Sequence, residues 1–461
     1  MKNAILIDFG STFTKVVAVS LKKQQRLCTV RYPSTVKNDA RIGLLKCFDA
    51  VKQAIGERPF KEAIKLASSS AAGGLRMAVI GLSETLSITA GRNVAFGAGA
   101  RIIKTLSGRI TPEDAEYIAN SQVEIILFCG GYEKGNTTII LHNAEVLAVS
   151  GINMPVIYAG NSYVAQDVRK ILTLHGKECF IVRNIIPNVG ELDTAPAEEI
   201  IRDVFMKRIV NMKGLDKVKS ELGGVLMPTP AAVLSAGELL SKGWGRSGGL
   251  GPLMIVDIGG ATTDIHSYAD QTPCKGAKII GAREEYAKRT VEGDLGMRES
   301  SNSLAEEIGW DNIAHQTGVS VDRLEKSIRY RVEVNEFLAD SDKEKKIDRV
   351  LAMSAAKISA RRHAGVLEHI YSKSCKLIQK GKNLTEVCAV IGTGGPIICS
   401  ETPGEIIKGI LADREKEPNI LLPEKVQFYL DTDYMLYAAG LLKEIDPEAA
   451  LGLMKNSIRK L

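Results

Sequence analysis

The chain has 461 residues, a formal net charge of +6 at pH 7, and 45% hydrophobic residues. This length exceeds what one hydrophobic core usually organises, so we expect two or more domains. The charge is small for this size and the basic residues are scattered, so nucleic-acid binding is not indicated. Asp8 interrupts the first apolar run, so we expect no signal peptide, and no apolar run is long enough to span a membrane.

The cysteines and histidines exclude several classes of site. None of the eight cysteines belongs to a CxxC pair, and none of the six histidines lies in an HExxH motif. The phosphate-loop pattern GxxxxGK followed by Ser or Thr is also missing from the sequence. We therefore expect free thiols in a reducing cytoplasm, without a disulfide framework, a zinc-protease site or a Walker-type site.

The first predicted element is a β-hairpin. Ala4–Asp8 is apolar and ends in an acid, and Thr14–Val19 is rich in β-branched residues. A Gly-Ser-Thr turn joins the two strands. A helix is expected over residues 43–57, because apolar side chains recur there on one face. Residues 1–60 are expected to form the first part of one lobe.

Residues 61–195 show a different pattern, in which short apolar runs recur. Three apolar runs recur there, at Val123–Gly131, Pro155–Asn161 and Cys179–Pro187, and glycine, asparagine or proline ends each run. Ser162 can cap a helix between the second and third runs. Strand–helix–strand at this spacing predicts a small parallel sheet with covering helices, which we interpret as a Rossmann-like inserted or adapted subdomain.

A helix and a second strand–turn–strand are expected in residues 196–298. Residues 228–242 begin with Pro-Thr-Pro and continue as an alanine-rich helix whose small side chains allow close packing. Met254–Ala269, with the sequence MIVDIGGATTDIHSYA, follows a glycine-rich link. This range is expected to end the first lobe and to begin the second.

The last two ranges complete the predicted organisation. Residues 299–385 are charged and helix-forming without a strand signal, which predicts a helical subdomain. Residues 386–461 are expected to continue the second lobe. In this range Cys388–Ile398 reads as a strand that enters a glycine turn, and Asp431–Leu442 reads as a helix of small residues.

The turn near residue 10 occurs again near residue 259. When Ala4–Val19 is laid on Met254–Ala269, the residues that coincide are Asp8 and Asp257, Gly10 and Gly259, Ser11 and Gly260, Thr12 and Ala261, Thr14 and Thr263, and Lys15 and Asp264. The copies are too far apart for a solenoid repeat, but their separation suits two duplicated domain halves. Two unrelated hairpins are the alternative, which the threonine shared by both copies disfavours.

Such a turn has a physical use. Gly, Ser and Thr at a hairpin tip expose successive backbone N–H groups, which bind phosphate oxygens. Carboxylates at the strand ends repel phosphate, so they suit a Mg²⁺ ion held largely through its waters, or a water aimed at the γ-phosphate. The candidate catalytic and Mg²⁺-holding residues are Asp8, Asp257 and Asp264. The candidate phosphate-binding residues are Gly10, Ser11, Thr12, Thr14, Lys15, Gly259, Gly260, Thr262 and Thr263.

Together these motifs resemble the actin/Hsp70/sugar-kinase ATPase superfamily. Ile5–Lys15 is similar to its first phosphate motif and Met254–Ile265 to its second. Pro228–Gly237 and Asp433–Gly440 look like its two connecting helices, and Val390–Ile397 looks like its adenosine motif. The resemblance implies a duplicated ribonuclease H-like α/β fold that binds ATP and Mg²⁺. It also implies that the nucleotide contacts Gly392, Gly394 and Gly395.

A narrower resemblance covers nearly the whole chain. Ala67–Leu82, Arg289–Arg298 and the RRHAG sequence at Arg361–Gly365 resemble the MutL/GlmL family, which is unrelated to the mismatch-repair protein of similar name. That family implies an ATP-driven reactivating factor for an adenosylcobalamin-dependent mutase, such as glutamate mutase or an aminomutase. The sequence indicates no nucleic-acid or membrane partner, and it leaves an oligomer open.

Two details qualify what the resemblance implies. Met227 stands where Hsp70-like members carry an acidic residue, so hydrolysis would depend on Asp257 and Asp264 or be slow. The DxHxxG signature of cobalamin binding is missing, because the similar Asp264–Ala269 ends in alanine. Direct cobalamin binding is therefore not predicted. A small-molecule kinase and a filament-forming actin relative, both on the same fold, remain as alternative functions.

Three further segments have two interpretations each. Ser68–Arg76 is either a ligand loop or a polar connection. Cys129–Asn136 ends a predicted parallel strand, where ligands and ordinary turns both occur, and the turn is favoured. Glu292–Arg298 either senses the nucleotide state or caps a helix. The charged run Asp340–Arg349 is expected to be a solvated helix face.

Overall fold

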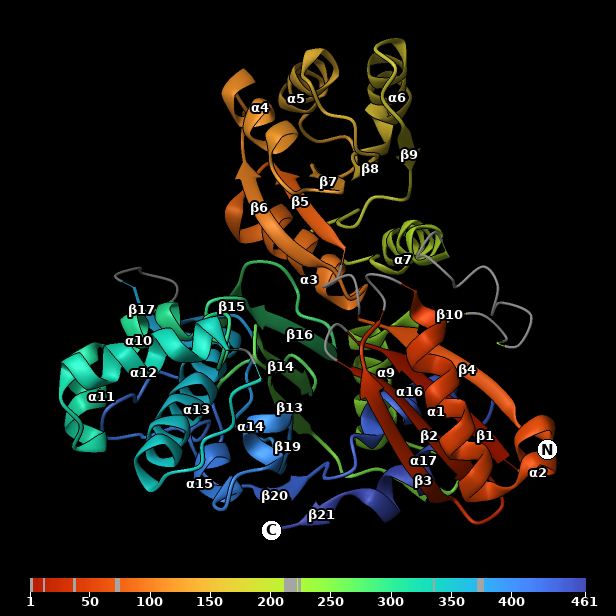
Figure 1. Ribbon diagram of the computed structural model, residues 1–461. Helices are drawn as coiled ribbons and strands as arrows, with labels where there is room; N and C mark the ends of the chain where they lie inside the picture. The colour runs from red at the N-terminus through yellow and green to blue at the C-terminus, as the bar shows by residue number, and fades with distance from the viewer. Residues whose placement is uncertain are drawn as a thin grey trace. The chain divides into compact units, whose positions relative to one another are not determined.

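The computed structural model describes residues 3–10, 13–35, 39–70, 75–210, 222, 225–334, 336–370 and 377–461 (Figure 1). The chain forms two compact units. Unit 1 comprises Met1–Ser235, Gly281–Glu284 and Tyr437–Ala450, and unit 2 comprises Ala236–Ile280, Glu285–Leu436 and Leu451–Leu461.

The first sheet of unit 1 has the strand order β10-β4-β1-β2-β3. β1 pairs antiparallel with β2 and parallel with β4, β2 pairs antiparallel with β3, and β10 pairs parallel with β4. The expected N-terminal hairpin and helix are therefore present. The bounds are β1 Asn3–Phe9, β2 Phe13–Ser20, β3 Gln25–Pro33, β4 Ile64–Ser69, β10 Val225–Pro228, α1 Ala40–Ile55 and α2 Glu57–Glu62.

A second sheet of unit 1 is parallel throughout, with the order β6-β5-β7-β8-β9, which is one of the two common doubly wound orders. Helices α4, α5 and α6 cover one face (Figure 1). The opposite face packs into the core that the first sheet shares. The bounds are β5 Arg76–Gly81, η1 Glu84–Ile88, α3 Thr89–Gly97, β6 Arg101–Ser107, α4 Pro112–Asn120, β7 Ile125–Gly130, α5 Thr138–Val149, β8 Val156–Gly160, η2 Ser162–Val164, α6 Ala165–Leu174, β9 Cys179–Ile181 and α7 Ala195–Val210.

This sheet is the Rossmann-like part expected from the sequence. The three apolar runs form β7, β8 and β9, while β5 and β6 are two further strands. Within residues 61–195, β4 pairs with β1 and so belongs to the first sheet. The exact bounds of an inserted subdomain remain a prediction.

The main sheet of unit 2 has the order β16-β14-β13-β19-β20-β21. β13 is antiparallel to β14 and parallel to β19, β14 is antiparallel to β16, and β19 is parallel to β20. These are the order and the directions of β3-β2-β1-β4-β10 in unit 1. The bounds are β13 Leu253–Ile258, β14 Thr263–Tyr268, β16 Ala287–Glu292, β19 Ala389–Thr393, β20 Gln427–Leu430 and β21 Arg459–Lys460.

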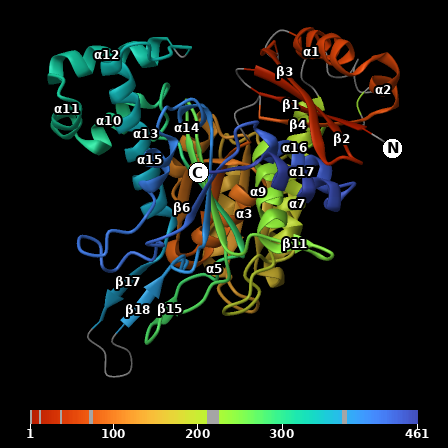
Figure 2. The same cartoon turned by 90° about the horizontal axis from the view of Figure 1, so that it is seen from below.

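The predicted helical region contains helices and two short strands. β17 and β18 pair with each other, and β18 pairs with β15, so the three lie side by side (Figure 2). The expectation that residues 299–385 contain helices without strands is therefore wrong, because four-residue strands that carry charged side chains give no apolar alternation. The bounds are β15 Lys278–Ile280, α10 Ser301–Ile308, α11 Trp310–Thr317, α12 Val321–Glu333, α13 Asp342–His363, β17 Val366–His369 and β18 Leu377–Lys380.

The two expected connecting helices follow equivalent strands, since α9 follows β10 and α16 follows β20. They pack as closely as their small residues allow, because a side chain at Gly440 would lie 1.9 Å from the carbonyl oxygen of Ala232. The remaining bounds are α9 Thr229–Lys242, β11 Gly243–Trp244, β12 Ser247–Gly248, α14 Gly395–Ile398, α15 Pro403–Lys408, α16 Met435–Lys443 and α17 Pro447–Ser457.

The repeated sheet confirms the predicted fold class. Each unit carries an antiparallel three-strand meander followed by two parallel strands, as expected for a duplicated ribonuclease H-like α/β ATPase fold. No helix in the described part of the chain is long and apolar enough to cross a membrane. The seven cysteines that the structure describes are free thiols, and Cys375 lies outside the described residues.

Candidate functional site

The two predicted turns are closed by the same hydrogen bond. The Gly10 N–H donates to the Phe13 carbonyl at 3.0 Å, and the Gly259 N–H donates to the Thr262 carbonyl at 2.8 Å. The strand pairing is also the same, because Asp8 lies opposite Lys15 and Asp257 lies opposite Asp264. The sequence alignment of the two copies is therefore a structural equivalence.

Asp8 in the first hairpin is a buried carboxylate, 4% exposed. Thr229, the first residue of α9, donates its hydroxyl to Asp8 Oδ1 at 2.6 Å, and its Oγ1 lies 3.1 Å from Ser68 Oγ. Burial raises the pKa of Asp8, while the Lys15 charge and the Thr229 hydrogen bond act to lower it. This carboxylate is therefore fixed in position by the connecting helix that follows β10.

Side chains and backbone from other elements hold the base of the first turn. The Ser34 hydroxyl donates to the Gly10 carbonyl at 2.7 Å, and the Ser70 N–H donates to the Phe9 carbonyl at 2.9 Å. Thr14 is fully buried below the turn. Two predicted phosphate-binding residues, Ser11 and Thr12, lie outside the described residues.

The Ser68–Arg76 segment divides between two elements. Ser68 and Ser69 end β4 and donate to the carbonyls of β1 residues, whereas Arg76 begins β5 and forms a salt bridge with Glu124. Residues 71–74 lie outside the described part. Only the Ser68 end of this segment is therefore placed beside Asp8.

In the second hairpin a cation offsets one of two facing carboxylates. Arg289 of β16 is 5% exposed, and its Nη2 lies 3.4 Å from both oxygens of Asp264. Burial raises the pKa of Asp264, and the charge and hydrogen bonds of Arg289 act to lower it. Arg289 therefore does for Asp264 what Lys15 does for Asp8, but from a third strand.

The Glu292–Arg298 segment packs directly on the second turn. The N–H groups of Met297 and Arg298 donate to the carbonyls of Gly259 and Gly260 at 3.0 and 2.7 Å. Two side chains continue these contacts, because Thr263 donates to the Leu295 carbonyl at 2.7 Å and Ser300 donates to the Ala261 carbonyl at 2.9 Å. These bonds occupy the carbonyl groups of Gly259, Gly260 and Ala261.

The predicted adenosine motif closes against the strand that leads into this turn. Gly394 has φ +89°, and a side chain there would lie 2.2 Å from the Ile258 carbonyl and 2.6 Å from Asp257 Oδ1. Only glycine suits both the backbone conformation and this approach. Gly392 lies in β19, and Gly395 begins α14. The second phosphate motif and the adenosine motif are thus adjacent within unit 2.

Comparison with known proteins identifies the family of the chain. A family model described as MutL protein matches residues 4–458. The chain belongs to the MutL family. This is the glutamate-mutase-associated family, not the DNA-repair family of that name. The chain is 39% identical to "Protein MutL" of Clostridium tetanomorphum over 99% of each chain.

Solved structures resemble this MutL-family chain only distantly. Ethanolamine utilization protein EutJ from Carboxydothermus hydrogenoformans is 10% identical with a TM-score of 0.28, over 98% of this chain and 90% of EutJ. Xylulose kinase from Bifidobacterium adolescentis is 12% identical with a TM-score of 0.32, over 100% of this chain and 94% of the kinase. The strand order of the two repeated sheets, and not these distant resemblances, identifies the fold.

The MutL-family motifs at 289–298 and 361–365 contact each other. Arg362 near the end of α13 forms salt bridges with Glu292 and Asp294 at 2.8 Å. His363 lies with its ring nitrogens 2.8 Å from the hydroxyls of Thr290 and Ser267. The segment that covers the second turn is therefore attached to the C-terminal end of α13.

Sequence reasoning missed three side chains of these sites. Thr229 and Arg289 lie within quoted motifs, but nothing in the sequence pairs them with Asp8 and Asp264. Asp431 is 1% exposed and accepts hydrogen bonds from Met435 N–H and Leu436 N–H at the start of α16. Its acidic position before a small-residue helix was the available signal, because aspartate often caps helices.

The polar groups fit the Mg²⁺ ion expected from the sequence. Asp257 and Asp264 face each other across adjacent strands, and Arg289 offsets only part of their charge. Among the described residues, no group of three or more His, Cys, Asp or Glu side chains is arranged to hold a metal directly. A cation at this hairpin would therefore be held largely through water, as carboxylate–Mg²⁺ sites commonly are.

Proposed function

We propose that this chain is an ATP-dependent accessory factor that reactivates an adenosylcobalamin-dependent mutase, such as glutamate mutase or an aminomutase. The observation that carries the proposal is the closed glycine turn, which occurs twice with a carboxylate at the same strand position in each copy. Membership of the MutL family supports a mutase as the partner. A cytoplasmic location is part of this proposal, because that compartment supplies ATP and keeps thiols reduced.

In this proposal both turns bind the phosphates of Mg·ATP. Because the Gly10 and Gly259 N–H groups close the turns, the N–H groups that follow them, at Ser11 and Thr12 and at Gly260–Thr262, would donate to phosphate oxygens, as consecutive N–H groups do in other anion sites. Lys15 would add a positive charge. Gly392, Gly394 and Gly395 would pass beneath the adenosine, because their backbone has no side chain in the way.

Three carboxylates would serve the metal and the attacking water. Asp8, Asp257 and Asp264 would hold Mg²⁺ through its waters, which supplies charge stabilisation for phosphoryl transfer. Met227 lies opposite Ser68 and is 7% exposed, so this position brings no carboxylate to the first hairpin. Hydrolysis would therefore be slow, which suits a switch better than a metabolic enzyme.

The conformational step would act on the partner enzyme. Nucleotide-dependent closure and opening of lobes is a common way to convert hydrolysis into work on a protein. The Rossmann-like sheet with α4, α5 and α6 is the part that we assign to contact with the mutase. When the mutase releases damaged cobalamin, intact coenzyme could bind to the mutase again.

The test uses glutamate mutase inactivated with hydroxocobalamin. Adding the full chain with ATP, Mg²⁺ and fresh adenosylcobalamin should restore turnover, and Asp8→Asn or Asp257→Asn should lose this effect. Asp270→Asn is the matched control, because Asp270 is exposed just beyond β14. No recovery with the unchanged chain would refute the role for that mutase. Phosphate transfer to added sugars or acids would instead indicate a kinase.

A further inference from the structure

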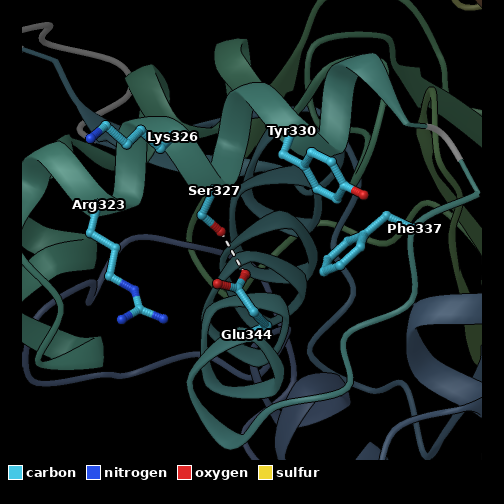
Figure 3. Close-up of a pocket in the computed structure, with 6 residues that line it drawn as sticks. All are labelled: Arg323, Lys326, Ser327, Tyr330, Phe337 and Glu344. Carbon is cyan, nitrogen blue, oxygen red and sulfur yellow. Dashed lines mark hydrogen bonds between the residues drawn. The ribbon is translucent and has the colours of Figure 1, made fainter.

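A cavity of about 350 Å³ opens between α12 and the beginning of α13 (Figure 3). Its volume is at the lower end for ligand sites and would hold a few side chains. It lies entirely within unit 2, on the helical region that the proposed nucleotide chemistry does not use. The lining residues are Arg323, Lys326, Ser327, Tyr330, Phe337 and Glu344.

The cavity wall carries two exposed positive side chains, Arg323 and Lys326, and the Arg323 charge also acts on Glu344 in the same wall. Glu344 accepts hydrogen bonds from Ser327 Oγ at 2.6 Å and from Arg331 Nη1 at 2.8 Å. Burial acts to raise the pKa of Glu344, but these hydrogen bonds and the nearby positive charges outweigh it and lower the pKa. This carboxylate therefore stays ionised and is already paired with Arg331. Arg323 and Lys326 are exposed, and within the described part of the chain neither forms a hydrogen bond or salt bridge.

The other wall is aromatic. Tyr330 is 50% exposed and meets the Phe337 ring edge to face, with ring centroids 5.3 Å apart. Leu338, which follows Phe337, is 79% exposed. An exposed apolar surface beside two cations suits a ligand that presents carboxylates next to an apolar side chain.

A charge network runs from this cavity to the second turn. Arg331, which is fully buried, donates to Asp348 Oδ1 at 2.9 Å, and Arg298 donates to Asp348 Oδ2 at 3.1 Å. Arg298 also donates to the Phe337 carbonyl at 3.0 Å, and its own N–H holds the Gly260 carbonyl. A displacement of Phe337 therefore reaches the turn through one side chain.

We propose that the α12 cavity is a docking site for a segment of a partner protein that carries carboxylates beside a leucine or aromatic side chain, and that its occupancy is transmitted to the second turn through Arg298. Charge complementarity decides the occupant. Arg331 and Arg298 form salt bridges with Glu344 and Asp348, and the exposed Arg323 and Lys326, which form none with the described residues, face the partner. The docking step does not depend on the proposed ATPase role.

The binding test uses a fluorescein-labelled eight-residue peptide that alternates Glu and Leu, with a Lys-Leu peptide as its opposite. Fluorescence anisotropy with the full chain should show that the Glu-Leu peptide binds and that binding weakens with salt, as expected for exposed charges. The Lys-Leu peptide should not bind. Absence of Glu-Leu binding up to millimolar protein, or equal binding of the Lys-Leu peptide, would overturn the docking site.

Charge-reversal variants locate the site. Arg323→Glu with Lys326→Glu should weaken Glu-Leu binding at least tenfold, and both side chains are exposed, so folding should be unaffected. Arg329→Glu with Lys343→Glu is the matched control, because both are exposed outside the lining and the net charge changes equally. Equal weakening in both variants would show a non-specific charge effect and overturn the proposal.

The link to the turn has its own readout. Amide hydrogen exchange over residues 259–263 should slow at least threefold when the Glu-Leu peptide binds. In Arg298→Lys, which keeps the charge but cannot make the forked contacts, the peptide should still bind and this protection should disappear. Unchanged exchange in the original chain, or full protection in Arg298→Lys, would overturn the transmission through Arg298.

Discussion

The two glycine hairpins have the same backbone and different charge. In the first, Asp8 faces Lys15, so the pair of strands carries one charge of each sign. In the second, Asp257 faces Asp264, and the compensating charge comes from Arg289 on the next strand. The first hairpin could fold with its own charges balanced, whereas the second depends on a neighbour. The two copies therefore share the geometry of the turn, but the positive charge that balances a carboxylate comes from a different strand in each copy.

The difference extends to the strands beside each hairpin. Asp8 lies opposite Ser68, which lies opposite Met227, and Asp257 lies opposite Thr393, whose hydroxyl is 3.4 Å from the Asp431 carboxylate. The first copy therefore has a methionine where the second has a buried acid. The carboxylates of Asp257 and Asp264 on adjacent strands, with Asp431 beyond them, would attract a cation. This favours the second hairpin as the main Mg²⁺ ligand in the proposed site.

The largest expected effect comes from giving the second hairpin the first hairpin's charge. Asp264→Lys places a second cation against buried Arg289 and should cost about 3–5 kcal/mol in the free energy of unfolding. Urea unfolding of the original chain and of the variant measures this difference in the free energy of unfolding. Asp270→Lys, at an exposed position just beyond the same strand, should change stability by less than about 0.5 kcal/mol. A cost below about 1 kcal/mol for Asp264→Lys would mean that Arg289 does not support the hairpin.

The acid beside the second hairpin should give a pH-dependent signature. Burial raises the pKa of Asp431 from 3.8 to about 6, against the hydrogen bonds from Met435, Leu436 and Thr393. The folded state holds this proton more tightly than the unfolded state. The resulting stability is fully present below pH 3.8 and is lost as the pH rises through about 6.

Asp431→Asn should remove that pH dependence. Relative to the variant, the original chain should lose up to about 3 kcal/mol of stability between pH 4 and pH 7, by the usual conversion of a pKa difference. Urea unfolding at several pH values, with Asp270→Asn as a control that keeps the original slope, checks this. A constant difference between the chains across this range would contradict the assignment.

The support of the first hairpin should depend on one hydroxyl. Thr229→Val removes the hydrogen bond to buried Asp8 and should cost about 1–3 kcal/mol. The loss should be greater at pH 7 than at pH 4, because the bond stabilises the ionised form. Thr229→Ser keeps the hydroxyl and should recover most of the stability. If valine and serine behave alike in urea unfolding, the hydroxyl has no role.

The smallest effects come from the serines that hold each turn. Ser34→Ala removes a hydrogen bond to the Gly10 carbonyl, and Ser300→Ala removes a hydroxyl that lies 2.9 Å from the Ala261 carbonyl and 2.7 Å from the Gly293 carbonyl. Each should cost about 0.5–1.5 kcal/mol. Similar costs would show that the two turns are held equally and that charge alone distinguishes them. A large cost in one turn only would revise that comparison.

The elements that can be predicted from the sequence are those that a local residue pattern encodes. Alternation of apolar residues, turn residues and helix caps predict both hairpins and the alanine-rich helix. They also predict the three strands that begin near Val123, Pro155 and Cys179. The duplication can be recognised because the sequence of the turn occurs twice. By contrast, the contacts of Thr229 with Asp8 and of Arg298 with the second turn join residues far apart in the chain. Such contacts depend on strand order, which no local pattern specifies.

The most direct test of the account is a crystal structure with Mg²⁺ and a non-hydrolysable ATP analogue. We predict that backbone N–H groups from both the Gly10 turn and the Gly259 turn donate to phosphate oxygens, with the metal waters held by Asp8, Asp257 and Asp264. A triphosphate bound by one turn alone, or bound elsewhere on the chain, would contradict it.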